Sequence, residues 1–527
     1  MSTTPSEAES SAVPVAAEPP VPAVPAPAPA APAERPKVPH MGLIVILVCS
    51  AFVVILNETV ISIALPDLIE ELNITARSAQ WLTTAFALTM AVVIPVTGFL
   101  IERWKTRTIF ITAMSLFTAG TLLAGIAPGF GLLLFARVVQ ASGTAMMMPL
   151  LMTTILVLVP MEVRGRVMGF VGIVMAVAPA LGPTVAGVVL QYMSWRSIFF
   201  IVLPFAVALL LVGIFILKNV GEQNRRPIDL LSIPLSALGF GGLVYALSSL
   251  GASSQAGGAE AADQAAADGV VVWIALAVGA VSLALFVWRQ FALIKGKGPL
   301  LDLRVFGSKT FTIGIGVMMI AFAALLGTGI LLPLYMQQVR ALDTVTVGLI
   351  LLPGGLLMGL LGPIVGILFD RYGARTLMVC GSAVVVLALF GVSTFNASTP
   401  VWLIVVVYTC LSGGLAFLFT PVFTAALGLL PPHLYSHGSA TLSTLQQVAG
   451  AAGTALLVAV FSTVSAAASS SGAGALPGEL AGLQWAFSLA AALALAAFVL
   501  SFFMPGHKAT LAAMEAAKAE GMAPVGH

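Results

Sequence analysis

Two ionisable side chains lie inside long apolar runs, where a charged group is costly. Glu58 follows Asn57 within the first run, and Arg137 lies in the run over residues 131–158. Burial among apolar side chains favours a protonated carboxyl group, which is what a proton carrier needs. An unpaired buried cation is expensive, so Arg137 must meet a carboxylate, backbone carbonyls or water. The pattern indicates a proton-coupling site with Glu58 as the carrier, Asn57 beside it, and Arg137 tuning the exchange.

Each residue also has a purely structural explanation. Glu58 could be held permanently in a hydrogen bond with Asn57, Thr59 or a neighbouring helix. Arg137 could be a fixed tether between helices. Acids within membrane spans usually mark ion or substrate pathways, which favours function for Glu58. For Arg137 the coupling role and the tether are equally supported.

A short signature occurs twice, 268 positions apart. The copies consist of Gly98, Glu102, Arg103 and Arg107, and of Gly366, Asp370, Arg371 and Arg375. Each copy joins two apolar runs, so the repeat predicts two homologous bundles in one membrane. The glycines allow helices to approach closely, and the charged groups can pair with one another or with adjacent helix ends. We expect a conformational gate here, because a topology anchor set by charge alone would not explain two matching copies.

The run over residues 166–190 contains Pro179, Gly182, Pro183 and Gly187. Proline removes a backbone donor and can kink a helix, while glycine admits a close neighbour. The composition suits a pliable helix between two bundles, although a packing kink would explain the prolines equally well.

Polar, aromatic and methionine side chains within other runs are candidate lining of a substrate cavity, although helix packing explains most of them equally well. They are Trp81, Gln140, Met147, Tyr335, Gln338, Tyr408 and Gln446.

The composition describes a protein that spans a membrane many times. The chain is 59% hydrophobic and 8% charged, whereas soluble domains carry about 25% charged residues. A bilayer-crossing helix needs roughly 20 mainly apolar residues, and fourteen runs qualify. They cover 41–65, 79–101, 108–127, 131–158, 166–190, 197–217, 229–250, 270–290, 310–336, 344–369, 375–395, 400–430, 437–465 and 480–504.

The distribution of lysine and arginine orients these runs. With both termini in the cytoplasm, nineteen of the 23 basic residues fall on the inner side, as the positive-inside rule requires. The expected organisation is an all-α membrane protein with a six-helix bundle over 41–217, a linker with two inserted helices over 218–309, and a second six-helix bundle over 310–504. A disordered Pro/Ala-rich tail over 1–40 and a tail over 505–527 are expected in the cytoplasm.

Several other classes of protein lack support. No P-loop, nucleophile elbow or metalloprotease motif occurs, so neither an enzyme nor an ATP-driven pump is indicated. The net charge of +2 and the absence of basic runs argue against nucleic acid. His433 and His437 are four residues apart, a spacing that can bind metal, but no third ligand is near and an ordinary loop is expected. No cofactor or metal is predicted, and a proton gradient is the expected energy source.

Taken together, these motifs resemble those of the major facilitator superfamily. The two signatures, Arg137 with Gln140, and Gly182 with Pro183 match its motifs, the last being associated with antiporters. The fourteen spans, Leu65-Pro66 at the end of the first helix, and Trp195-Arg196 with Phe199-Phe200 are similar to its drug:proton antiporter branch. The run Ile55-Leu-Asn-Glu-Thr59 is most similar to lincomycin-resistance-type exporters.

Two residues depart from that pattern. Many members carry aspartate at the position of Asn57, whereas here the acid is the next residue, Glu58. Lys105 replaces the usual glycine of the first signature, in which Glu102 also stands for aspartate.

The resemblance implies a proton-coupled multidrug exporter in the plasma membrane of a bacterium. It implies small hydrophobic or amphipathic substrates, protons and membrane lipids as partners, with no nucleotide, and transport by rocking of the bundles. A lipid, an amino acid or a secreted metabolite remains an alternative cargo, and a non-transporting membrane sensor is a third possibility. The sequence shows few opposed charges for a zwitterionic cargo, and its tails are too short for a sensor domain.

Overall fold

The apolar runs form fourteen long helices in the computed structural model, which describes residues 41–160, 163–219, 229–253, 261–294, 298–470 and 475–506. The helices are α1 (Met41–Leu72), α2 (Ala76–Arg103), α3 (Thr106–Gly125), α4 (Phe130–Leu158), α5 (Arg164–Tyr192), α6 (Arg196–Ile216), α7 (Ser232–Ser253), α8 (Ala261–Leu293), α9 (Lys309–Leu334), α10 (Thr344–Tyr372), α11 (Ala374–Ser393), α12 (Val401–Gly428), α13 (Tyr435–Ala468) and α14 (Ala475–Ser501). Within the described residues, fourteen helices are long and apolar enough to cross a membrane, and no strand occurs. The predicted number of spans is confirmed.

The expected tail over 1–40 and residues 507–527 of the second tail lie outside the described residues, as does most of the basic stretch over 218–226. Short helical turns occupy Leu303–Gly307 (η2) and Pro432–Leu434 (η4), and a π-helical turn, Tyr335–Val339 (η3), follows α9.

The expected end of the first helix at Leu65-Pro66 is wrong. Helix α1 continues through Pro66 to Leu72. A proline inside a helix forfeits one backbone hydrogen bond. The sequence after it carries Asp67, Glu70 and Glu71, which suit water rather than lipid. We infer that the last turns of α1 leave the apolar layer, where water can satisfy the freed carbonyl.

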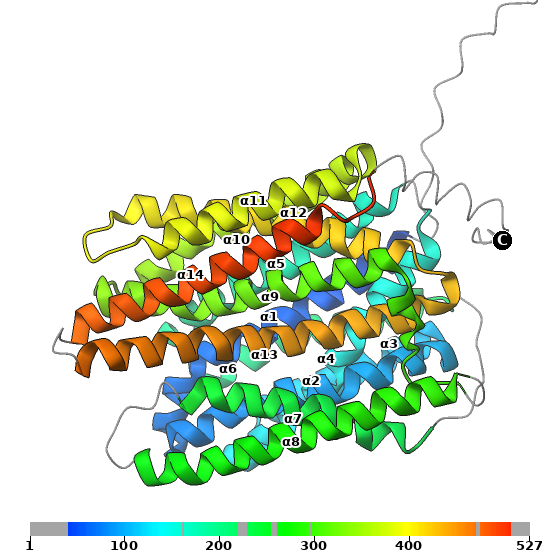
Figure 1. Cartoon of the computed structure of the whole chain (residues 1–527). Helices are drawn as coiled ribbons and strands as arrows, with labels where there is room; N and C mark the ends of the chain where they lie inside the picture. The colour runs from blue at the N-terminus through cyan, green and yellow to red at the C-terminus, as the bar shows by residue number, and fades with distance from the viewer. Residues whose placement is uncertain are drawn as a thin grey trace, which may run out of the picture. The chain divides into compact units, whose positions relative to one another are not determined.

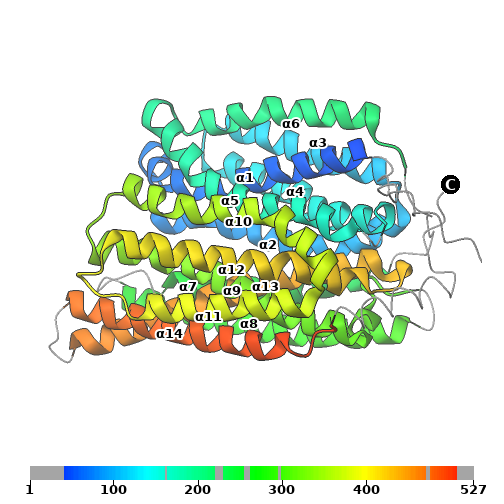
Figure 2. The ribbon, with the colours of Figure 1, turned by 90° about the horizontal axis from the view of Figure 1, so that it is seen from above.

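The neighbours of each helix repeat between the first six and the last six helices. In the set α1–α6, which we call the N-bundle, α1 packs on α5, α3 on α4 and α6, and α2 on α4. In the set α9–α14, the C-bundle, α9 packs on α13, α11 on α12 and α14, and α10 on α12. Helix order therefore supports the internal repeat, and Figures 1 and 2 show the two sets side by side.

Four helices, α2, α5, α10 and α13, make the most extensive contacts between the bundles. The most extensive contact joins α5 to α10, and the corresponding contact in the repeat joins α13 to α2. The inserted helices α7 and α8 pack on each other, and α7 also lies against α2 and α13 (Figure 1). The insertion thus lies beside the seam between the bundles.

Candidate functional site

A buried polar centre lies between α1, α3 and α4. Arg137 on α4 is 1% exposed. Its guanidinium Nη1 donates to Gln140 Oε1 at 2.6 Å and, more weakly, to Asn57 Oδ1 at 3.4 Å. Gln140 Nε2 in turn donates to Thr121 Oγ1 at 2.8 Å, and the guanidinium lies 4.1 Å from the centre of the Phe86 ring. The cation is therefore held by amide oxygens and an aromatic face.

The centre retains unused hydrogen-bond donors. Asn57 Nδ2 and Arg137 Nε are buried and have no hydrogen-bond partner among the described residues. Buried donors without acceptors are costly, and such groups need an explanation such as an unseen ligand or water. This centre has the capacity to bind a carboxylate, a water molecule or a polar group of a substrate.

Glu58 is partly buried and lies on the side of α1 that faces away from α6. Val53, Leu56 and Val60 line a small apolar pocket with α5 and α6. At about 100° per residue, Glu58 lies on the opposite face of α1 from these three side chains. Glu58 is therefore turned away from that pocket, and its carboxylate and the Arg137 cation attract each other.

Helix α5 packs closely against α1 next to Glu58. A Cβ atom at Gly182 would come within 2.0 Å of Thr59 Oγ1, so the absence of a side chain lets the two helices meet next to Glu58. A Cβ atom at Gly187 would meet nothing within 4 Å. Pro179 and Pro183 both lie within α5, which runs without interruption from Arg164 to Tyr192. The close approach at Gly182 couples the position of α5 to the segment that carries the acid.

The close packing of α3 on α4 positions the amide partner of Arg137. A Cβ atom at Gly120 would lie 2.6 Å from the backbone nitrogen of Gln140 and 2.8 Å from Ala136 O. These are backbone atoms, which cannot rotate away. We expect Gly120→Val to lower the stability of the purified protein by about 1–3 kcal/mol, the usual cost of overpacking.

Thermal unfolding in detergent measures this effect. Gly131→Val is the matched control, because a Cβ atom at Gly131 on α4 would meet nothing within 4 Å. Equal melting temperatures for the two variants would contradict the role assigned to the α3–α4 crossing.

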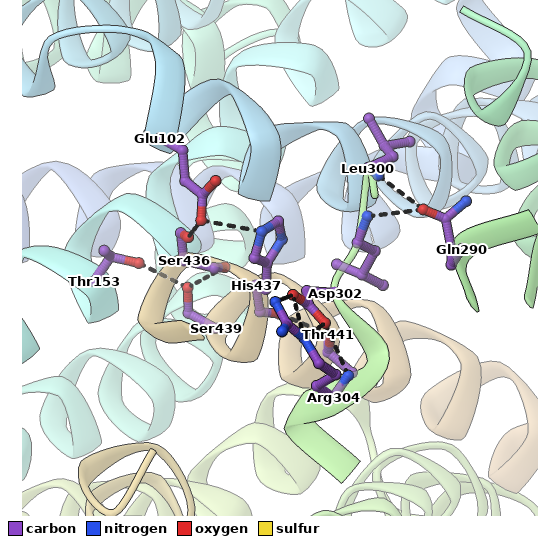
Figure 3. A network of polar contacts seen from close by, with 11 residues as sticks. Glu102, Thr153, Gln290, Leu300, Asp302, Arg304, Ser436, His437, Ser439 and Thr441 are labelled. Atoms are coloured by element: carbon purple, nitrogen blue, oxygen red, sulfur yellow. Dashed lines mark hydrogen bonds and ion pairs between the residues drawn. The ribbon is translucent and has the colours of Figure 1, made fainter. Parts of the chain in front are cut away.

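The first signature reaches the C-bundle. We call the end of the bundles that carries Arg103, Arg107, Arg371 and Arg375 the basic end. There Glu102 Oε1 accepts a hydrogen bond from Ser436 Oγ at 2.8 Å and lies at ion-pair distance, 3.0 Å, from His437 Nε2, and both partners are in the first turn of α13 (Figure 3). A Cβ atom at Gly98 would come within 2.8 Å of Ala440 Cβ. The glycine permits the crossing, and the acid then binds the start of α13.

The second signature makes the corresponding contact in the opposite direction. Asp370 Oδ1 accepts from the backbone nitrogen of Gly165 at 3.1 Å, and Oδ2 accepts from that of Arg166 at 3.3 Å. The carboxylate thus caps the start of α5, where the helix dipole favours a negative charge. A Cβ atom at Gly366 would come within 2.2 Å of Gly165 O, so only glycine fits.

The arginines of the signatures lie at the same end. Arg103 is partly buried and has a partner. The Arg371 guanidinium lies 5.3 Å from the centre of the Tyr372 ring. Arg107 and Arg375 are exposed. Their part in a gate remains a prediction.

Arg164 is a functional residue that the sequence did not single out. It is 2% exposed, and it donates through Nε to Val159 O at 3.0 Å and through Nη2 to Leu156 O, both at the end of α4. Its Nη1 donates at 3.3 Å to Gly428 O, the last residue of α12, and to Tyr435 Oη at the start of α13. One cation therefore joins the carbonyl ends of the corresponding helices α4 and α12.

A further hydrogen bond closes the same end. Thr153 Oγ1 and Ser439 Oγ lie 2.8 Å apart, across the contact between α4 and α13 (Figure 3). At the opposite end, the polar contacts of the described residues include two that stay within a bundle: Arg196 pairs with Glu71, and Tyr335 Oη donates to Asn396 O at 2.8 Å. The structure is thus held shut between the bundles at the basic end.

The residues expected to line a cavity occupy several different surroundings. Gln140 belongs to the polar centre, and Met147 is fully buried in the core. Trp81 stacks on Tyr245 of α7, with ring centres 5.8 Å apart. Tyr335 is buried against the loop that precedes α12, whereas Gln338 is exposed after α9. Tyr408 lies against Gly354. Gln446 is buried on α13, and its Nε2 has no hydrogen-bond partner among the described residues. A shared cavity for these residues remains a prediction.

The two histidines are not in one loop as expected. His433 lies in η4, whereas His437 lies in the first turn of α13, which begins earlier than predicted, at Tyr435. Because His437 faces Glu102 from a buried position, it belongs to the contact between the bundles. The described residues contain no group of three side chains suited to hold a metal ion.

Comparison with known proteins connects this arrangement to a family. A family model described as Major Facilitator Superfamily matches residues 47–454. The chain is 40% identical over 473 residues to the lincomycin resistance protein LmrB of Listeria monocytogenes, covering 89% of this chain and 97% of that protein. It is 43% identical over 457 residues to YcnB, an uncharacterized MFS-type transporter of Bacillus subtilis, covering 87% and 93% of the two chains. The solved human organic anion transporter MFSD10 shares the fold, with a TM-score of 0.63 at 15% identity, covering 88% and 100%.

Two repeated six-helix bundles with an inserted pair of helices define a multi-pass membrane transporter, not an enzyme. The chain belongs to the major facilitator superfamily. The resemblance inferred from the paired signatures is confirmed at the level of the family, and small molecules are the class of substrate that its transporter relatives imply.

Proposed function

We propose that this protein is a proton-coupled exporter of hydrophobic or amphipathic compounds, a drug:proton antiporter that works by alternating access. The observation that carries the proposal is the partly buried Glu58 beside the buried cation Arg137. Its similarity to a protein named for lincomycin resistance supports drugs as the substrate class. The bacterial plasma membrane is the corresponding location, with protons, substrate and lipid as the only partners that the mechanism needs.

The chemistry of coupling is a competition for one site. When Glu58 is ionised, it attracts the Arg137 cation. When a proton neutralises Glu58, that attraction is lost and Arg137 keeps its amide partners on Asn57 and Gln140. A substrate that binds well only to the ionised form displaces the proton, and the proton displaces the substrate.

The closed basic end provides the conformational part of the cycle. We propose that this end faces the cytoplasm, since the arginines of both signatures lie there. Glu102 and Asp370 then hold the cytoplasmic side shut, each from one bundle on the other. Gly182 and the prolines of α5 allow that helix to move with α1 as the bundles rock.

Uptake of a fluorescent cationic dye into inverted membrane vesicles tests this function. An imposed gradient with acidic vesicle interior should drive dye accumulation, and collapse of the pH gradient with a proton carrier should abolish it. The matched control is vesicles without the protein. Accumulation that persists after the pH gradient collapses would exclude proton coupling.

A further inference from the structure

The segment that follows the inserted helices, residues 298–308, lies against the contact between Glu102 and α13. Leu300, Leu301 and Leu303 of this segment are buried in one apolar cluster with Phe99 of α2 and Ala440 of α13. Phe240 of α7 and Phe286 of α8 belong to the same cluster. The segment therefore contacts both bundles at the crossing that Gly98 makes possible.

One buried glutamine fixes the start of the segment. Gln290 on α8 is fully buried, and its Oε1 accepts from the backbone nitrogens of Leu300 at 2.8 Å and Leu301 at 3.2 Å (Figure 3). Its Nε2 donates to Ser232 Oγ on α7 at 2.9 Å. Next to Gln290 in the chain, Arg289 forms a bidentate ion pair with Asp229, with Nε–Oδ2 and Nη2–Oδ1 distances of 2.7 and 2.8 Å. Both inserted helices are thus tied to the segment.

The segment carries a buried acid next to the gate. Asp302 is 2% exposed and caps η2, and its carboxylate accepts four hydrogen bonds from the backbone and guanidinium of Arg304. It also interacts electrostatically with His437. Burial raises the pKa of Asp302, but the bonds from Arg304 and the nearby positive charges outweigh it and leave this pKa below its usual range. Because a lowered carboxyl pKa keeps the group ionised down to acidic pH, Asp302 stays negative throughout the neutral range.

His437 lies between this acid and the acid of the first signature. Its side chain is 5% exposed, Nε2 is 3.0 Å from Glu102 Oε1, and Nδ1 has no hydrogen-bond partner among the described residues. An imidazole flanked by carboxylates from two different elements can hold both when it is charged. The carboxylates of Asp302 and Glu102 therefore act on one imidazole from two different elements.

We propose that the inserted helices position the gate: their exit segment places Asp302 beside His437, and His437 then holds Glu102 of the other bundle. Asp302 and Gln290 are positioning residues in this arrangement, and the inference rests on the proposed gate. The insertion thereby acquires a mechanical role, as a latch on the basic end.

Other charged groups surround the latch. On α2, Arg103 is adjacent to Glu102 in the chain, and in the segment Arg304 is paired with Asp302. Arg164 reaches Tyr435, two residues before His437. His433 in η4 and Lys309 at the start of α9 belong to other elements packed on α13. His437 Nε2 lies 3.0 Å from Glu102 Oε1.

Distance measurements between spin labels test the latch on the full-length protein. Labels at Thr108 and Thr376, which are exposed in the first turns of α3 and α11, report the separation of the bundles at the basic end. The exposed native cysteines, Cys49, Cys380 and Cys410, are first replaced by serine. We expect Asp302→Asn and His437→Gln each to lower the closed-to-open ratio at least about fivefold, the lower end of typical coupling between sites. The double variant should be no more open than the more open single variant, because both act through one contact.

A conservative substitution separates positioning from simple structural support. Asp302→Glu should keep more of the closed population than Asp302→Asn, because it retains the carboxylate that interacts with His437. Equal opening of the basic end by the two variants would contradict the role assigned to this charge. Asp343→Asn is the matched control: Asp343 also caps a helix, α10, but at the opposite end. It should leave the closed-to-open ratio unchanged.

Glu102→Gln distinguishes failure of the latch from failure of the gate. If Glu102→Gln opens the basic end while Asp302→Asn leaves the distances unchanged, the latch is overturned and the gate stands. If Glu102→Gln also leaves the basic end closed, the gate itself fails, and the latch fails with it.

Discussion

Glu58→Gln should abolish accumulation of substrate against a gradient while leaving exchange of substrate for substrate intact. Glutamine retains the size and much of the polarity of a protonated glutamate but cannot release a proton. One proton moving down a gradient of one pH unit supplies about 1.4 kcal/mol, which can sustain a tenfold concentration ratio of substrate. Without the carrier this contribution disappears, so the ratio should fall to about one.

Two transport assays on the same proteoliposomes separate these effects. One measures accumulation driven by an imposed pH gradient, and the other measures exchange of labelled for unlabelled substrate at equal pH. Asn57→Asp is a useful second variant, because it adds an acid on the neighbouring face of α1, next to Arg137. Glu58→Gln with unchanged gradient-driven accumulation would remove Glu58 from the mechanism.

Arg164→Met should open the basic end and lower the stability of the protein. Methionine fills a similar volume but donates no hydrogen bond, so the acceptors on Leu156, Val159, Gly428 and Tyr435 lose their shared donor. Buried acceptors without donors cost about 1–3 kcal/mol each, so the total loss should be about 3 kcal/mol or more. One part of this loss of stability comes from the hydrogen bonds to α4, and the other part comes from the hydrogen bonds that Arg164 makes across the bundles.

Tyr435→Phe isolates the second part. It removes one hydrogen bond across the bundles while keeping the aromatic ring that lies 5.4 Å from the Arg164 guanidinium. We expect the closed-to-open ratio to fall about fivefold, corresponding to about 1 kcal/mol, with little change in melting temperature. The labels at positions 108 and 376 measure the closed population. If Arg164→Met leaves that population unchanged, Arg164 does not hold the basic end shut.

The general architecture could be predicted from the sequence because apolar length and the position of basic residues are local properties. The repeat of Gly98 and Gly366 likewise indicated two related bundles, since both copies precede similar helices. What the local pattern could not supply was the partner of each charged group. Asp370 caps Gly165 and Arg166 across about 200 positions of sequence, and such pairing follows only from the arrangement of the bundles.

Arg164 was overlooked, and the partner of His437 was not foreseen, for the same reason. Arg164 resembles any other basic residue that follows a span, and only the folded chain shows that it is buried against two helix ends. His437 was considered only as one of two loop histidines with a metal-like spacing, whereas it lies in the first turn of α13 and contacts Glu102. The continuation of α1 past Pro66 is a third case, in which context overrode the usual effect of proline.

The two halves of the gate are similar but not equivalent. Asp370 binds backbone nitrogens, which any sequence at the start of α5 would provide. Glu102 binds the side chains of Ser436 and His437, so its contact depends on residue type and on the protonation of histidine. The longer acid of the first signature is suited to reach these side chains. We infer that the Glu102 side is the adjustable part of the closure.

Proton movement driven by substrate tests the central claim most directly. Proteoliposomes containing the purified protein and a trapped pH indicator are given a substrate gradient with equal pH on both sides. Antiport predicts that protons move opposite to the substrate, so the internal pH changes in proportion to the substrate transported, and that Glu58→Gln abolishes the change. Substrate movement by the parent protein without any change in internal pH would contradict the account.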